Sequence, residues 1–204
     1  IEVYRINKNN MDFVGEALNE DFHLSFPFLF DHEGHIYMMP ETSEINEIRI
    51  YKSINFPLEW EHVSTPINNI SAADSMILKK NDYWYILTNI DTFKIGDHCS
   101  ELHIFSSKNL FSSEWVSNEL NPIITNSDLA RNGGLLYHQD EIFRVSQTHS
   151  FLEYGVGKSI SKINSISDFD YNEEVISKYI AKDDGFKGSH HISLNNEYFL
   201  TDLK

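Results

Sequence analysis

The sequence is poor in cysteine, glycine, proline and positive charge, and each shortage excludes a class of protein. Cys99 is the single cysteine among 204 residues, so no internal disulfide can form and a thiolate metal site is not expected. Nine glycines and five prolines are too few for a low-complexity or collagen-like chain. Lysine and arginine number 16 against 31 acidic residues, and the formal charge of −15 would repel the phosphates of a nucleic acid.

Long hydrophobic runs are also absent, because no apolar stretch approaches the ~20 residues of a membrane span. With so little cysteine we expect a reducing compartment, and therefore a cytoplasmic protein. The chain begins at Ile1 and not at a methionine, so the lack of a signal peptide carries little weight. What the sequence does have is 41% hydrophobic and 13% aromatic residues, which is enough for one well-buried core.

An internal repeat organises the chain. Residues 23–41 read as two short strands, FPFLF and HIYMM, joined by a turn in which Gly34 supplies the positive φ. The same design returns as MILKKNDYWYILTN, GGLLYHQDEIFRVSQ and HHISLNNEYFLTD. Each copy has an aromatic residue at one equivalent place and a polar residue four positions later: Tyr37 and Glu41, Tyr85 and Asn89, Phe143 and Gln147, Tyr198 and Asp202. Such self-similarity is typical of a repeat architecture.

A second, outer hairpin follows each complete inner hairpin, so one unit holds four short strands in about 50 residues. EIRIYKS and EWEHV in the first unit match ELHIFSS and EWVSN in the second, which aligns Trp60 with Trp115. No convincing amphipathic helix separates the strands. Four-stranded units repeated in this way predict an all-β fold, a β-propeller of four-stranded antiparallel blades. A β-sandwich is the structural alternative.

We expect one propeller domain over residues 1–204. It divides into an outer hairpin (1–22), three repeats (23–70, 71–127 and 128–186) and a final inner hairpin (187–204). The first and last hairpins can pair into one blade, which closes a four-bladed ring. The alternative is a five-bladed ring whose first inner hairpin is missing.

Five segments, in order along the chain, carry a resemblance to a known family: HLSFPFLFDHEGHIYMMPET, AADSMI, DLARNGG, SQTHSFLEYG and GSHHISLNNEYFLTDLK. They resemble the propeller domain at the N-terminus of plant glucosamine inositolphosphorylceramide transferases. Similar domains occur in bacterial proteins linked to surface-polysaccharide synthesis. The resemblance covers essentially the whole chain, and the family is similar in turn to the five-bladed propellers of arabinanases, xylosidases and invertases.

The resemblance favours the five-bladed ring, because family members begin with a further inner hairpin that carries an Ala-Asp-Pro-Phe segment. In the hydrolase relatives the aspartate of that segment is the catalytic base or nucleophile, and this sequence lacks it. Asp74 falls where those relatives place their general acid, which they carry as glutamate. Ser25 stands where they carry another aspartate, so the resemblance implies sugar binding more firmly than hydrolysis.

Polar residues at the strand starts and strand ends of the inner hairpins share one face of a propeller and predict a funnel. The catalytic candidates there are Asp74 and Glu41, and the ligand-binding candidates are His23, Arg131, Gln147, Tyr154 and His190. Such groups bind the vicinal hydroxyls of sugars by hydrogen bonds. Arg131 either binds an anionic ligand or neutralises Glu41 and Asp74. Gln147 and Tyr154 are included because they match positions of the resembling family.

Two functions from different classes follow. The first is a carbohydrate-binding propeller that acts in glycan or glycolipid assembly, as accessory to a fused or associated transferase domain. Its partner would be a sugar or oligosaccharide, including an anionic or nucleotide-linked one. The second is a glycosidase-like hydrolase that uses Asp74 as general acid, with Glu41 or a carboxylate of the missing blade. A purely structural interaction platform is the third reading. His98, Cys99 and His103 match no zinc signature, so no metal and no other cofactor is expected.

Overall fold

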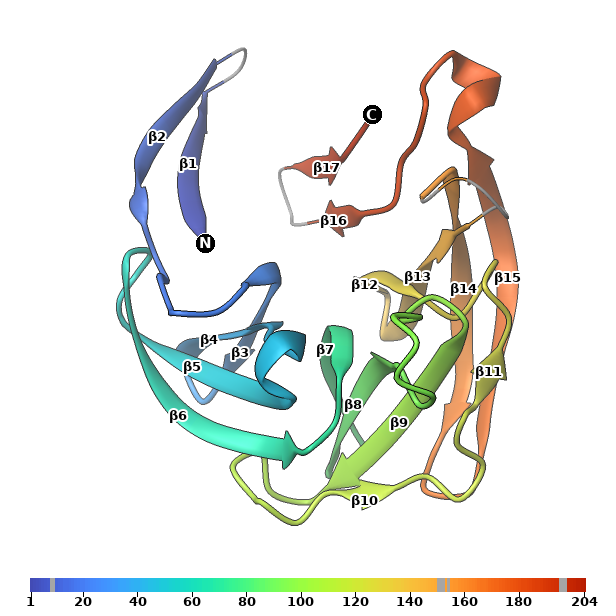
Figure 1. Ribbon diagram of the computed structural model, residues 1–204, viewed down its shortest axis with the longest axis horizontal. Helices are drawn as coiled ribbons and strands as arrows, with labels where there is room; N and C mark the ends of the chain where they lie inside the picture. Colours follow the sequence, from blue (N-terminus) through green and yellow to red (C-terminus); the bar gives the residue numbers. More distant parts are fainter. Residues whose placement is uncertain (8–9, 150–152, 154, 195–197) are drawn as a thin grey trace.

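The computed structural model describes residues 1–7, 10–149, 153, 155–194 and 198–204. Within them lie three antiparallel sheets of the predicted kind, which we call blades, arranged around a common centre (Figure 1). The first blade has the order β3-β4-β5-β6, and its strands are β3 (Ser25–His32), β4 (His35–Glu41), β5 (Glu47–Asn55) and β6 (Glu59–Asn68). The innermost strand of each blade is therefore the first one in sequence, as expected for a propeller.

The other two blades repeat this order. The second consists of β7 (Ala72–Lys80), β8 (Tyr83–Ile90), β9 (Glu101–Ser107) and β10 (Val116–Ser117), with β11 (Ile124–Thr125) also paired to β9. The third consists of β12 (Asn132–His138), β13 (Glu141–Thr148), β14 (Gly157–Ile166) and β15 (Tyr171–Ile180). The helices of the described residues are two short 3-10 turns, Ser43–Ile45 and Ala181–Asp184, and neither is long or apolar enough to span a membrane.

The matched residues of the repeat occupy equivalent places. Tyr37, Tyr85 and Phe143 each stand at the third position of the second strand of a blade, in β4, β8 and β13. Trp60 and Trp115 each donate the indole N–H to a backbone carbonyl three residues earlier, at 2.8 and 2.9 Å. The same local fold has therefore been built twice from the aligned residues. Tyr198 differs from the other three aromatic residues, because it lies just before a strand and not within it.

The outer strand predicted at EWVSN is much shorter than its counterpart β6. Of the predicted segment, Val116 and Ser117 pair with β9, and an asparagine side chain then occupies the edge of β9 before β11 pairs with it again. The amide of Asn121 accepts the N–H of Ile104 at 2.8 Å and donates to its carbonyl at 2.7 Å. These two bonds replace the ladder that a continued strand would have made.

The hydrophobic core lies between neighbouring blades. One cluster joins Met39 and Ile50 of the first blade to Ile86 of the second. Another joins Leu87 of the second blade to Leu135 of the third. Each sheet thus buries its faces against its neighbours, which is the reason such repeats fold only as an array.

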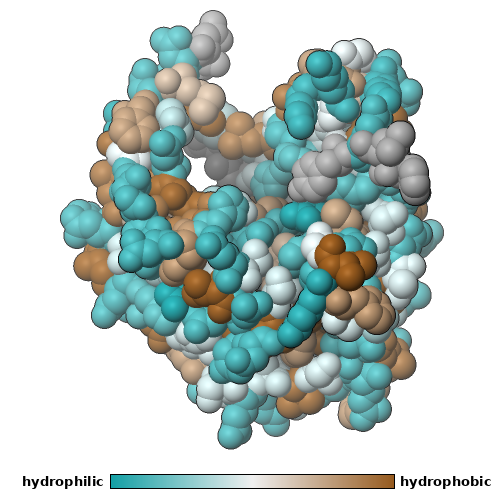
Figure 2. All heavy atoms as spheres, in the orientation of Figure 1, coloured by the Kyte–Doolittle hydropathy of each residue, from teal (hydrophilic) through white to brown (hydrophobic). Residues whose placement is uncertain are grey.

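The chain starts and finishes in two separate hairpins. β1 (Glu2–Asn7) pairs with β2 (Asn10–Glu16), and β16 (Ile192–Leu194) pairs with β17 (Phe199–Thr201). Among the described residues the two hairpins form separate two-stranded sheets and do not combine into a fourth blade. They stand on either side of an opening in the arrangement (Figure 1), which appears as a notch in the surface (Figure 2).

Candidate functional site

A β-bulge places Asp74 where it can meet residues of other blades. The register of β7 against β8 shifts between Ala73 and Met76, and Asp74 within this bulge has a φ of 45°. The first strand of the first blade is bulged at the matching place, where Phe26 has a φ of 42°. Bulges re-aim side chains, and a left-handed backbone at a residue other than glycine is costly enough to suggest a functional position.

Arg131 joins the carboxylates of two other blades. Its Nε donates to Oδ2 of Asp74 at 2.7 Å, and its Nη2 lies 4.0 Å from Oε2 of Glu41. Its Nη1 also contacts Sγ of Cys99 at 3.6 Å. Glu41 ends β4, Asp74 belongs to β7, and Arg131 precedes β12, so three blades contribute to one cluster.

Gln147, at the matching end of β13, completes this cluster. Its Nε2 donates to Oδ2 of Asp74 at 2.8 Å and to the carbonyl of Asn132 at 2.6 Å. The Oε1 atom of the same side chain is buried, and no group of the described residues donates a hydrogen bond to it. We call Glu41, Asp74, Arg131 and Gln147 the polar mouth.

The charges of the polar mouth oppose one another at Asp74. Burial raises the pKa of this carboxyl to about 6; Arg131 acts in the opposite direction, and Glu41 raises the pKa further. Oε2 of Glu41 lies 3.4 Å from the backbone N of Asp74, and Arg131 lies within 4.0 Å of both carboxylates. The two acidic residues therefore lie close together at one cation.

A histidine pair lies beside the polar mouth. Burial and the nearby charges of Arg131 and His190 lower the pKa of His149 to about 4, so its ring is neutral at pH 7. Nδ1 of His149 accepts the N–H of Gly155 at 3.1 Å. Nδ1 of His190 lies against Oδ2 of Asp202. Burial raises the pKa of Asp202, but hydrogen bonds from His190 outweigh it and hold that pKa well below its usual range.

The structure thus brings together four of the predicted residues, Glu41, Asp74, Arg131 and Gln147, with His190 nearby. His23 is not joined to them. The side chain of His23 is exposed, and the contact of that residue is a backbone N–H donated to Glu44 at 2.7 Å. Tyr154 lies outside the described residues.

Three residues near the polar mouth were missed by the sequence analysis: Cys99, Asn132 and His149. Asn132 donates its amide to the carbonyls of Asp74 and Leu87, at 2.9 and 3.0 Å. The signal for it was the neighbouring Gly133-Gly134 pair, since close backbone packing requires such glycines. Cys99 and His149 lie in irregular segments, and the repeat gives no guide to those. No three His, Cys, Asp or Glu side chains of the described residues come close enough together to hold a metal ion.

Comparison with known sequences agrees with the predicted resemblance. Residues 6–195 match the family model described as glucosamine inositolphosphorylceramide transferase 1, N-terminal. The Arabidopsis thaliana protein named glucosamine inositolphosphorylceramide transferase 1 is 34% identical over 163 residues, which are 78% of this chain and 21% of that protein. The protein of the same name from Oryza sativa subsp. japonica is 33% identical over 79% of this chain and 22% of its own length. The chain thus spans about one-fifth of these relatives.

Comparison with solved structures confirms the resemblance to the five-bladed propellers of family-43 glycoside hydrolases. A GH43 β-xylosidase/α-arabinofuranosidase from a compost microbial metagenome has a TM-score of 0.63 at 11% identity, over 91% of this chain and 71% of its own. A GH43 enzyme from Xanthomonas citri, complexed with xylotriose, has a TM-score of 0.61 at 9% identity, over 90% of this chain and 67% of its own. An α-L-arabinanase from Penicillium chrysogenum has a TM-score of 0.57 at 12% identity, over 85% of this chain and 57% of its own. At these identities the likeness concerns the fold alone.

Proposed function

The chain belongs to the family of N-terminal domains of glucosamine inositolphosphorylceramide transferase 1, and on that premise we propose that it binds a sugar at the polar mouth. It would do so in glycan or glycolipid assembly, as accessory to a transferase domain. The observation that carries the proposal is the meeting of Glu41, Asp74, Arg131 and Gln147 from three blades. Carboxylates, an amide and a guanidinium are the groups that recognise sugar hydroxyls.

The buried Oε1 of Gln147 supports this proposal. An acceptor that makes no hydrogen bond is costly to bury, and a hydroxyl group of a ligand can supply the missing donor. Arg131 adds a positive charge beside it, so an anionic sugar or a sugar phosphate is also a suitable ligand. We expect weak binding by the domain alone, with dissociation constants of about millimolar to micromolar, because each hydroxyl exchanges water for protein at small net gain.

A glycan array followed by calorimetric titration tests the proposal. Gln147→Leu is expected to weaken binding about tenfold, through the loss of one or two hydrogen bonds. Arg131→Lys keeps the charge and loses the forked donors, so it separates an anionic ligand, which would still bind, from a neutral one. An array on which the wild-type domain binds no sugar or sugar phosphate would overturn the proposal.

Hydrolysis is the second candidate function, and one observation favours it. An aspartate with a pKa of about 6 can act as a general acid near neutral pH. The shared position of Glu41 and Asp74 at Arg131 weighs against it, because the two carboxyl groups of a glycosidase stand about 5–10 Å apart with the sugar between them. Turnover of an aryl glycoside by the wild type, lost in Asp74→Asn, would decide for the hydrolase. If neither protein shows turnover, sugar binding without hydrolysis remains as the proposed function.

We further propose that the three blades belong to a five-bladed ring and not to a closed four-bladed one. The separation of the β1–β2 and β16–β17 hairpins supports this, since a four-bladed ring requires them to join edge to edge. The similarity to family-43 hydrolases supports it as well. A crystal structure in which β17 pairs with β1 would contradict it.

A further inference from the structure

The channel between the blades contains a second concave site at the end remote from the polar mouth. This far cavity has a volume of about 660 Å³ and is lined by residues of the innermost strands β3, β7, β12 and β16, together with Trp84 of β8. None of the four polar-mouth residues lines it. A volume of this size is typical of small-molecule sites.

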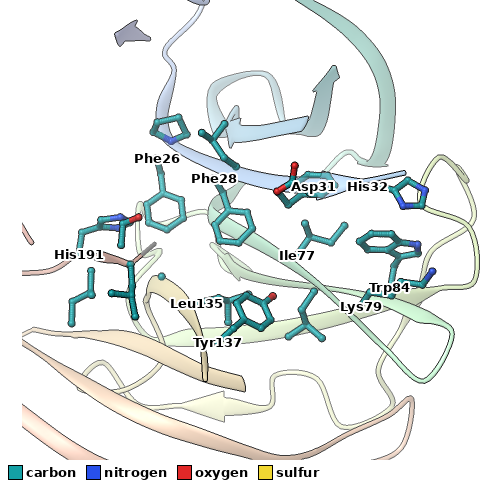
Figure 3. Close-up of a pocket in the computed structure, with 18 of the residues that line it drawn as sticks. Phe26, Phe28, Asp31, His32, Ile77, Lys79, Trp84, Leu135, Tyr137 and His191 are labelled. Atoms are coloured by element: carbon teal, nitrogen blue, oxygen red, sulfur yellow. The ribbon is translucent and has the colours of Figure 1, made fainter. Parts of the chain in front are cut away.

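The walls of the far cavity are apolar side chains from opposite blades. Phe28 of β3 and Tyr137 of β12 project toward one another across it (Figure 3). Ile77, Leu135 and Ile192 are buried residues that also line it. These apolar side chains form the part of the cavity that suits an alkyl chain or an aryl ring, because a ligand there removes apolar surface from water. The polar lining residues are Asp31, His32, Glu33, Lys79, His191 and Ser193.

Two large side chains at the rim remain in contact with water although they line a concave surface. Tyr137 is 57% exposed and Leu194 is 50% exposed. A ligand that covers them gains the free energy of removing apolar surface from water. This is the arrangement of a ligand site and not of a packed core.

Charged groups are gathered at one end of the far cavity. Asp31 and Glu33 supply two carboxylates against the single ammonium of Lys79, which lies 5.4 Å from the centre of the Trp84 ring. Nε2 of His32, which also lines the cavity, lies 3.8 Å from Oε1 of Glu33, so Asp31 is the carboxylate left for a ligand. Asp31 is exposed to solvent, and within the described part of the chain no side chain forms an ion pair with its carboxylate. The net negative charge favours a head group with a positive charge and hydrogen-bond donors, which such a carboxylate can accept.

We propose that the far cavity binds an amphiphile whose alkyl or aryl body lies between Phe28 and Tyr137 and whose ammonium head meets Asp31. The site is independent of the polar mouth, and its ligand need not be a sugar. Trp84 lines the cavity, so its fluorescence reports on occupancy.

Calorimetry with octylammonium, butylammonium and octanoate tests the proposal. Octylammonium is expected to bind, and butylammonium at least about tenfold more weakly, because it buries four fewer methylene groups. Octanoate should also bind about tenfold more weakly, since its head has the wrong charge. Equal binding of octylammonium and octanoate, or no binding of either, would overturn the proposal.

Matched variants locate the binding. Tyr137→Ser is expected to weaken octylammonium binding about tenfold, Tyr137→Phe to restore it, and Asp31→Asn to remove the preference for the ammonium head. Phe169→Ser is the control: Phe169 is 67% exposed but lies in the turn between β14 and β15, away from the cavity. Octylammonium binding that Tyr137→Ser and Asp31→Asn both leave unchanged would contradict the assignment.

The two proposals fail separately. Gln147→Leu changes the polar mouth and is expected to leave octylammonium binding unchanged. Sugar binding without octylammonium binding would refute only the proposal of a ligand site in the far cavity. Octylammonium binding without sugar binding would refute only the proposal of a sugar site at the polar mouth.

Discussion

Asp74 is held by two opposing influences, and they make its ionisation a sensitive property of the molecule. Burial and the neighbouring Glu41 favour the neutral acid, whereas Arg131 and Gln147 donate to the carboxylate. Burial prevails, and the pKa rises from an ordinary 3.8 to about 6. The native fold therefore prefers Asp74 protonated, and ionising it at neutral pH costs stability.

The sign of this effect can be tested with Asp74→Asn. Because the folded-state pKa is raised, the contribution of Asp74 to the free energy of unfolding is fully present below about pH 4 and is lost as the pH rises through about 6. Asparagine resembles the neutral acid and does not ionise. The free energy of unfolding of the variant, relative to that of the wild type, should therefore rise by roughly 2 kcal/mol between pH 4 and pH 7.5. Urea unfolding at both pH values measures the gain. A difference between the two proteins that does not change with pH would refute it.

Arg144 is the most deeply buried charge of the described chain, and it supports the segment that carries Arg131. Its Nε and Nη2 donate to both oxygens of Glu173 at 2.7 Å, and Nη2 also donates to the carbonyl of Leu129 at 2.6 Å. Burial would raise the pKa of Glu173, but Arg144 outweighs it and lowers the pKa. The ion pair is therefore fully charged at neutral pH.

Removing one partner of this ion pair should destabilise the fold far more than removing both. Arg144→Met leaves a buried, unpaired carboxylate and is expected to cost about 3–5 kcal/mol of unfolding free energy, measured in urea. The double variant Arg144→Met with Glu173→Leu should recover most of that loss. If the double variant is as unstable as the sum of the two single ones, the pair does not act as a unit.

At the scale of elements, one lysine fastens the final hairpin to the third blade. Nζ of Lys158, on β14, donates to Oγ of Ser189 at 2.5 Å and also to Oγ1 of Thr201 and the carbonyl of His191. Burial lowers the pKa of this ammonium, and three oxygen acceptors compensate for the burial. The β16–β17 hairpin is short, so this attachment matters to its position.

Lys158→Met should loosen the final hairpin selectively. Amide hydrogen exchange in β16 and β17 is expected to accelerate at least about tenfold, which corresponds to a loss of about 1.4 kcal/mol of local stability. Exchange in the first blade should not change. Lys162→Met is the control on the same strand, because Lys162 pairs with Glu141 at the surface. Equal effects of the two variants would contradict the prediction.

β12 approaches β16 so closely that only glycine fits. A Cβ atom on Gly134, whose φ is 139°, would overlap the carbonyl oxygen of Ile192. Gly134→Ala should therefore displace the hairpin and lower the melting temperature. Gly34→Ala is the matched control, since Gly34 has a φ of 76° but open space around its Cβ position. A similar loss of about 1 kcal/mol in both variants would show that backbone strain alone is responsible.

At the scale of the whole molecule, the parts that could be predicted are those that the repeat expresses. Tyr37, Tyr85 and Phe143 revealed the equivalent hairpins, and Trp60 and Trp115 revealed the equivalent turns, because the same backbone hydrogen bonds recur in each copy. The face shared by Glu41, Asp74, Arg131 and Gln147 followed from the same alignment.

What could not be predicted depends on contacts that the repeat does not express. The bulge that turns Asp74 is a local break in register, and no residue type specifies it. The shortening of the outer strand at Val116 results from the side chain of Asn121, which has no counterpart in the first blade. The pairing of Arg144 with Glu173 skips the strand between them, so neither periodicity nor spacing indicated it.

The origin of the polar mouth in three neighbouring blades has a consequence for how such a protein can evolve. Repeat arrays change readily by duplicating or losing one unit, because each unit packs only on its neighbours. Here a unit inserted between the first and third blades would separate Arg131 from Glu41 or Asp74, and loss of the second blade would remove Asp74 itself. Selection for binding would therefore conserve the number and order of the blades, and a single blade transplanted into another protein would carry none of the function with it.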